Sequence, residues 1–104
     1  MANLSIAINH YLQALPQSPQ EITYFLNLFA PAVQLQFISA IYHGRDHLHS
    51  FHLRTDQPIT TENASHISLN EYFAIILEKG TNIESYLKKF AECAHNSGFD
   101  INLL

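Results

Sequence analysis

The sequence has few charged side chains, and positive charge is especially scarce. Its 104 residues include five lysines and arginines against nine aspartates and glutamates, which gives a net charge of −4 with neutral histidines. The first cation along the chain is Arg45. Because proteins that bind nucleic acid need clustered cations to neutralise phosphates, this composition disfavours a nucleic-acid partner.

Cysteine is also rare. Cys93 is the only one, so the chain forms no internal disulfide, and a reducing compartment is the simpler setting. No basic segment precedes Arg45, as a secretory signal or basic targeting peptide would require. We therefore expect a cytoplasmic location.

Three glycines are too few to suggest a phosphate-binding loop or a dinucleotide motif, and no nucleophile motif is present. The sequence therefore disfavours enzymatic activity, and it predicts neither a catalytic residue nor an organic cofactor. A bound transition metal is the one exception considered below.

No Asp, Glu, Lys or Arg lies between Glu21 and Arg45, and this stretch is long enough to span a membrane. Asn27, Pro31 and Gln34 interrupt it, however, with polar side chains and a helix-breaking proline. We expect two packed helices that meet at Pro31, and no membrane segment.

Hydrophobic residues make up 47% of the chain and charged residues only 13%, about half of what soluble domains typically contain. A chain of this length can bury one core, so we expect a single domain over residues 1–104. The apolar excess predicts a protein partner or self-association, with a homodimer as the simplest form. The alternative is a polar surface rich in Asn, Gln, Ser and His.

Apolar residues at helical spacing, together with strong start signals, predict an all-α fold of about five helices. Ser18 with Glu21 and Ser68 with Glu71 form capping-box patterns, and Thr81 begins a third. The expected helices span residues 3–15, 19–30, 31–50, 68–79 and 81–96.

The helix that begins at Pro31 is expected at the centre of the bundle, between the first two helices and the last two. Gly44 is a candidate end for it, but the apolar rows continue beyond this glycine, and we expect the helix to run to about Ser50. Residues 54–67 have the composition of a long loop. The alternative is an α+β fold with a small hairpin around residues 47–60.

Four of the seven histidines lie in the ten residues from His43 to His52. On a helix, His43 and His47 would share a face at i, i+4 spacing, and such a pair can chelate a transition metal. His49 and His52 would form a second pair at i, i+3. We expect these histidines to have structural roles. The alternative is a metal site at His43, His47, His49 and His52, although their spacing matches no zinc motif.

Three neighbours of these histidines are candidate binding residues. The polar tip of Tyr42 suits an interface, and Arg45 has Asp46 or the carboxylate of a ligand as a partner. We predict a small interaction or regulatory module of self-associating type, with a partner surface that includes residues 43–52 and the loop after them. The alternative is a metal- or small-ligand-binding protein that uses the same histidines.

Overall fold

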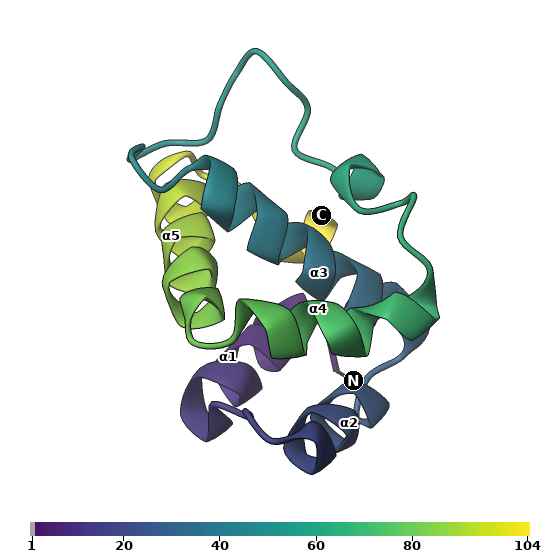
Figure 1. The fold of residues 1–104 in the computed structure, drawn as a ribbon. Helices are drawn as coiled ribbons and strands as arrows, with labels where there is room; N and C mark the ends of the chain where they lie inside the picture. The colour runs from purple at the N-terminus through teal and green to yellow at the C-terminus, as the bar shows by residue number, and fades with distance from the viewer. Residues whose placement is uncertain (1) are drawn as a thin grey trace.

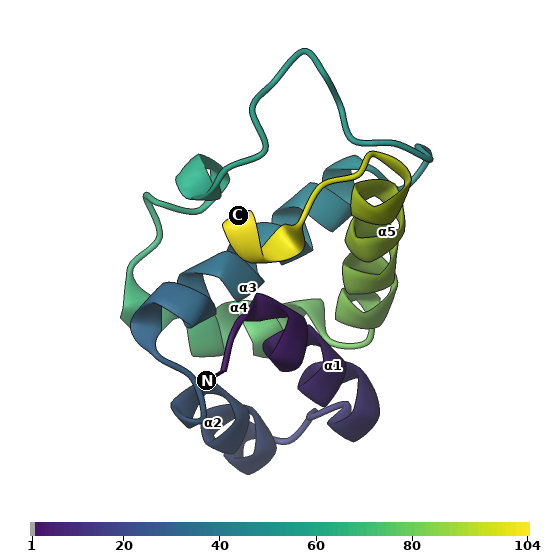
Figure 2. The ribbon, with the colours of Figure 1, turned by 180° about the vertical axis from the view of Figure 1, so that it is seen from behind.

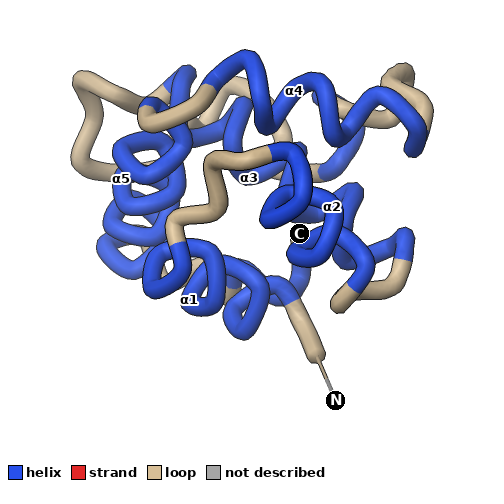
Figure 3. Tube along the Cα trace, turned by 60° about the horizontal axis from the view of Figure 1, so that its bottom comes forward, coloured by secondary structure: helices blue, strands red, loops and turns tan. Residues whose placement is uncertain are grey.

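The computed structural model describes residues 2–104 as a bundle of helices (Figure 1). No strand occurs among these residues (Figure 3), which confirms the all-α prediction of about five helices. The α-helices are α1 (Leu4–Ala14), α2 (Pro19–Asn27), α3 (Pro31–Asp46), α4 (Tyr72–Lys79) and α5 (Asn82–Asn96). The short 3₁₀-helices are η1 (Thr61–Asn63), η2 (Leu69–Glu71) and η3 (Ile101–Leu103).

Helix α3 crosses the middle of the molecule, with α1 and α5 packed against it (Figure 1). Its side chains Phe37, Ile38 and Ile41 are almost completely buried. Burying such a side chain contributes roughly 1.5–3 kcal/mol to folding. Helix α2 packs against α4, so the first and last helix pairs also meet each other and do not lie only on opposite sides of α3.

Helix starts follow the local signals in the sequence, with one exception. Asn3 caps α1 through its side-chain oxygen, Ser18 and Glu21 complete a capping box on α2, and Pro31 is the first residue of α3. The capping box predicted at Thr81 is wrong: this residue makes no side-chain cap. Its backbone angles are already helical, whereas a capping residue is extended.

The charge-free stretch divides at Pro31 into α2 and α3, as predicted. Within residues 2–104, no helix combines the length and the hydrophobicity that crossing a membrane requires.

Helix α3 ends at Asp46, before the predicted end near Ser50. The imidazole of His47 folds back, and its Nδ1 lies 2.7 Å from the carbonyl oxygen of His43, which it supplies with a hydrogen bond. A histidine side chain thus satisfies one of the free carbonyls at the helix end. Residues 47–60 form turns and bends without a strand, so the alternative α+β hairpin does not form either.

Gly44 lies inside α3 because the backbone of α5 passes next to it. A Cβ atom at this position would overlap the backbone carbonyl of Tyr86. Glycine costs a helix roughly 1 kcal/mol relative to alanine, and here it allows a close approach of two helix backbones. The helix runs through Gly44, as expected, and this glycine is a packing residue.

The apolar C-terminal segment, residues 99–104, docks on the body. The side-chain amide of Gln36 on α3 donates a hydrogen bond to the carbonyl of Leu104, at 2.7 Å. The backbone N–H of Ser5 donates to the side chain of Asn102, at 3.0 Å. Figure 2 shows this segment lying across α3 and next to the start of α1.

Candidate functional site

Helix α3 has a row of polar side chains on one buried face. Ser39 and His43 lie four residues apart on one side of the helix, and His47, the residue directly after the helix, continues this spacing. All three are buried, His47 with only 1% of its surface exposed. Buried polar groups need hydrogen-bond partners. For this row the partners come from residues 47–68, which we call the 47–68 connection, and from the end of α3 itself.

Ser39 and Asn63 hydrogen-bond to each other in both directions. The Ser39 hydroxyl donates to Oδ1 of Asn63 at 2.5 Å, and the Asn63 amide nitrogen donates to the Ser39 carbonyl at 3.1 Å. Asn63 belongs to η1, so this pair fixes the second half of the connection on α3. Because its amide is used in this way, Asn63 has a structural role.

His43 holds the same part of the connection. Its Nε2 lies 2.8 Å from the carbonyl oxygen of Thr60, and a carbonyl accepts only, so Nε2 bears the proton. The ring stacks on Phe90 of α5, with 5.6 Å between centroids. Burial lowers the pKa of His43, which keeps the imidazole neutral at neutral pH.

His47 uses both of its ring nitrogens. Nδ1 donates to the His43 carbonyl, and Nε2 accepts the backbone N–H of Arg54 at 3.0 Å. Only the neutral imidazole with its proton on Nδ1 makes both bonds. A metal bound by His47 would have to displace one of them.

The first part of the connection, which we call the 47–53 segment, is held by α5. Lys89 donates to the carbonyl of Ser50 at 3.1 Å, and the Asn96 amide donates to the carbonyl of Phe51 at 2.8 Å. The N–H of residue 53 donates to the Ser97 hydroxyl at 2.9 Å. The segment has no regular secondary structure, yet side chains from a rigid helix fix its backbone.

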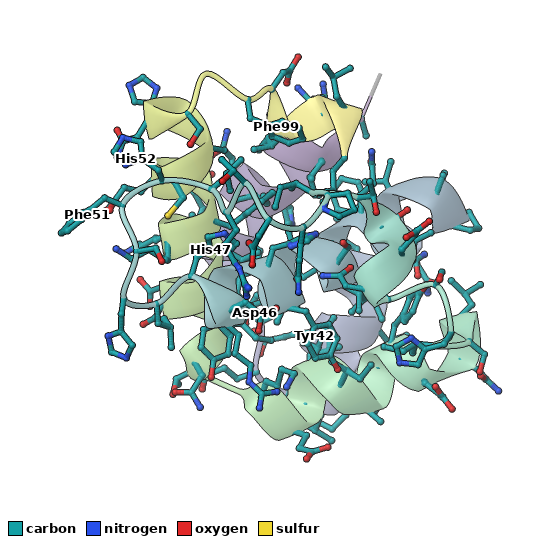
Figure 4. All side chains as sticks on the ribbon, turned by 90° about the horizontal axis from the view of Figure 1, so that it is seen from above. Tyr42, Asp46, His47, Phe51, His52 and Phe99 are labelled. Carbon is teal, nitrogen blue, oxygen red and sulfur yellow. The ribbon has the colours of Figure 1, made fainter. Side chains whose placement is uncertain are left out.

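The side chain of Phe51 points outward from this fixed backbone. It is 70% exposed, and Figure 4 shows it directed away from the body, whereas His47 lies within it. The ammonium group of Lys89 lies 5.3 Å from the centre of the Phe51 ring. Leu48 lies nearby in the chain and is also exposed. This end of the molecule therefore presents two exposed apolar side chains, Leu48 and Phe51, which we call the Phe51 patch.

The structure separates the four histidines predicted as metal ligands. His43 and His47 are buried, and His49 and His52 are exposed on the 47–53 segment. Among residues 2–104, no three His, Cys, Asp or Glu side chains lie close enough to hold a metal ion. The metal site remains a prediction. Within residues 2–104, the fold places no third ligand beside His43 and His47.

The predicted binding residues lie at the end of α3. Arg45 and Asp46 are exposed, and Tyr42 is partly buried with the ammonium group of Lys79 at 4.8 Å from its ring centre. Although Arg45 was the candidate partner of Asp46, no ion pair joins them. The sequence prediction of these residues as binding residues remains to be tested.

A cavity of about 300 Å³ lies between the end of α3 and residues 54–63. Asp46 and Glu62 line it, and so does Arg54. The guanidinium of Arg54 makes a two-pronged ion pair with Asp56, at 2.7 and 3.0 Å, which lowers the pKa of that carboxyl. Both signs of charge therefore surround this cavity, and a small polar molecule would fit its chemistry.

Sequence reasoning did not identify Ser39 or Asn63, nor the residues of α5 that hold the 47–53 segment. One signal was visible: Ser39, His43 and His47 recur at intervals of four in and directly after a helix that also carries apolar residues of the core. A polar row at helical spacing in such a helix indicates buried hydrogen bonding. The partners on α5 lie more than thirty residues away, and no sequence pattern marks them.

The comparisons with known proteins add no functional assignment. No family model matches the sequence, and no curated protein or solved structure matches it either.

Proposed function

We propose that this protein is a small interaction module that pairs with a second copy of itself through the Phe51 patch. The observation that supports this most directly is an aromatic side chain that is 70% exposed on a backbone fixed by hydrogen bonds from α5. Aromatic residues are enriched at the core of protein interfaces, where a few buried anchors contribute most of the binding energy.

The rigidity of the 47–53 segment favours binding. A flexible loop must be ordered when it binds, and each ordered side chain costs about 0.5–1.5 kcal/mol. Here the carbonyls of Ser50 and Phe51 already have their partners, and the side chain of Leu53 is buried. A partner would therefore meet a surface whose backbone is already in place.

The charges beside Phe51 suit a second copy of the same chain. Lys89 and Glu92 form an ion pair at 3.0 Å on this side of α5. In a two-fold symmetric interface each patch meets itself, so a patch that contains both signs can complement its own copy. A low content of charged residues, 13%, points the same way.

A cytoplasmic location is part of this proposal. Cys93 is a buried free thiol whose pKa is raised by burial, as expected for a small apolar core residue in a reducing compartment.

The test is the mass of the purified protein by light scattering over a range of concentrations. We expect a shift from monomer to dimer as concentration rises, and a monomer at all concentrations for Phe51→Ser. Tyr24→Ser is the matched control, because Tyr24 is 65% exposed but lies on α2; it should associate like the wild type. A wild type that stays monomeric, or a Phe51→Ser variant that still dimerises, contradicts the proposal.

A second candidate function is the binding of a small polar ligand, and the cavity between α3 and residues 54–63 favours it. A ligand there would contact Asp46 and Arg54, which lie next to the predicted histidines. Exchanging Asp46→Asn should then abolish any ligand-induced rise in melting temperature without changing the mass of the protein. An unchanged ligand response in this variant would exclude the cavity as the site.

A further inference from the structure

A second cavity, of about 450 Å³, lies between the end of α1 and the first turns of α2. These helices form the pair at the bottom of Figure 1, at the end of the molecule opposite the long connection. Ala14 and Pro16 contribute apolar surface to it, and His10, Tyr24 and Phe25 contribute aromatic rings. Its volume is in the range of small-molecule sites.

The aromatic rings that line this cavity differ in their packing: His10 and Phe25 are packed together, and Tyr24 is exposed. His10 stacks on Phe25 with 5.8 Å between centroids and 27° between planes, and Phe25 also packs against Phe37 in the core. Tyr24 is 65% exposed and borders the opening. The faces of aromatic rings have negative electrostatic potential, so they attract cations with little hydration.

Glu21 lines the cavity and is the only Asp, Glu, Lys or Arg among the first 44 residues. One oxygen of Glu21 accepts the N–H groups of Gln17 and Ser18, and these bonds lower its pKa, so the carboxylate is ionised at neutral pH. Its other oxygen makes no hydrogen bond within residues 2–104.

Two helix ends also contribute to the potential at the cavity. A helix has partial negative charge at its C-terminus, and basic side chains often neutralise it. The last turn of α1 contains no basic residue, and Ala14 from that turn lines the cavity. Gln20 and Glu21, which also line the cavity, belong to the first turn of α2, and a helix N-terminus has partial positive charge. The two helix ends therefore offset each other, and the carboxylate and the ring faces are what favour positive charge at this place.

We infer that this cavity binds a small organic cation, an alkylammonium compound with apolar substituents. The ammonium group would lie against the ring of Tyr24 and near the free oxygen of Glu21, and the substituents would contact His10 and Phe25. An anion would be repelled by Glu21. A metal ion would find only one carboxylate and no second charged ligand.

The test uses choline and its uncharged carbon analogue, 3,3-dimethylbutan-1-ol, in calorimetric and NMR titrations of the full chain. The two probes share a shape and differ in charge. We expect saturable binding of choline at one site, with shifts confined to residues lining this cavity, and binding of the alcohol weaker by about tenfold or more.

Two variants separate the contributions. Tyr24→Leu keeps an apolar wall but removes the ring, and Glu21→Gln removes the charge while its amide oxygen still caps Ser18. Each should weaken choline binding severalfold, with an unchanged circular dichroism spectrum. Phe51→Ser should bind choline like the wild type, because it lies at the other end of the molecule.

The inference is overturned if choline shows no saturable binding, or if the alcohol binds equally well. It is also overturned if Tyr24→Leu and Glu21→Gln both bind choline like the wild type. None of these results depends on whether the chain dimerises.

Discussion

Two pairs of histidines, close in sequence, lie in opposite environments. His43 and His47 are buried at the end of α3, where backbone groups bond to three of their ring nitrogens. His49 and His52 are exposed on the 47–53 segment. Helix α3 ends at Asp46 and a turn follows, so the two pairs do not lie on one helix. The comparison indicates that the buried pair fixes the connection, whereas the exposed pair lies on either side of Phe51 in the sequence.

The largest loss of stability is expected from Gly44→Ala, which should disrupt the packing of α3 against α5 on which both histidine pairs depend. The new Cβ would overlap the Tyr86 carbonyl, and separating α3 from α5 should lower the free energy of unfolding by about 3 kcal/mol. Urea denaturation measures this change. Gly98→Ala is the control: it meets no atom within 4 Å but has a φ of +68°, and it should cost only about 1 kcal/mol. If Gly44→Ala is as stable as the wild type, the close approach is wrong.

A smaller difference is expected between two matched substitutions, His47→Leu and His49→Leu. The first leaves the Arg54 N–H and the His43 carbonyl without their partner, and should cost about 2 kcal/mol. The second alters an exposed side chain and should stay within about 0.5 kcal/mol. Thermal and urea unfolding of both variants provide the comparison. Equal losses of stability would remove the distinction between the two pairs.

Acid should reduce the contribution of His43 to the stability of the fold. The pKa of His43 is lowered from an ordinary value of 6.5 by burial, so the unfolded chain takes up this proton first as pH falls. The stability that neutral His43 provides is complete above about pH 6.5, and it declines as pH falls toward the lowered native pKa, by at most about 1.4 kcal/mol per pH unit.

Unfolding free energies measured between pH 8 and 5 in wild type, His43→Leu and His52→Leu test this. His43→Leu should flatten the pH dependence, and His52→Leu should preserve it. A His43→Leu variant with the wild-type slope would show that another group causes it.

The smallest effect is expected from metal removal. His47 already has a partner for each nitrogen, and no third ligand joins His43 and His47 among residues 2–104. We expect elemental analysis of untagged protein to find no stoichiometric metal, and a chelator to leave the melting temperature unchanged. Stoichiometric zinc, nickel, iron or copper would instead support the metal prediction and require a different arrangement of the histidines.

The sequence predicted those features that depend on neighbouring residues. Ser18 and Glu21 start α2 because both partners of the capping box lie within four residues. Pro31 separates α2 from α3 because its ring fixes φ and removes the backbone N–H, which is tolerated only in the first turn of a helix. The burial of Phe37 and Ile41 follows from the helical spacing of the apolar residues after Pro31.

Features that depend on distant residues were not predictable. Nothing near Gly44 shows that Tyr86 passes next to it, so its role in packing was hidden. The end of α3 at Asp46 depends on the hydrogen bonds of His47, one of them with Arg54. Phe51 could be recognised as apolar, but its exposure follows from how α5 holds the backbone around it.

The most direct test of this account is the protonation state of each imidazole nitrogen, measured by NMR from the nitrogen chemical shifts of the histidine rings at neutral pH. His43 should bear its proton on Nε2, because this nitrogen faces the carbonyl of Thr60. His47 should bear its proton on Nδ1, because this nitrogen faces the carbonyl of His43 while Nε2 accepts the N–H of Arg54. Opposite tautomers in these two residues would confirm that they fix the connection presenting Phe51. The same tautomer in both, or signals averaged over two forms, would contradict it.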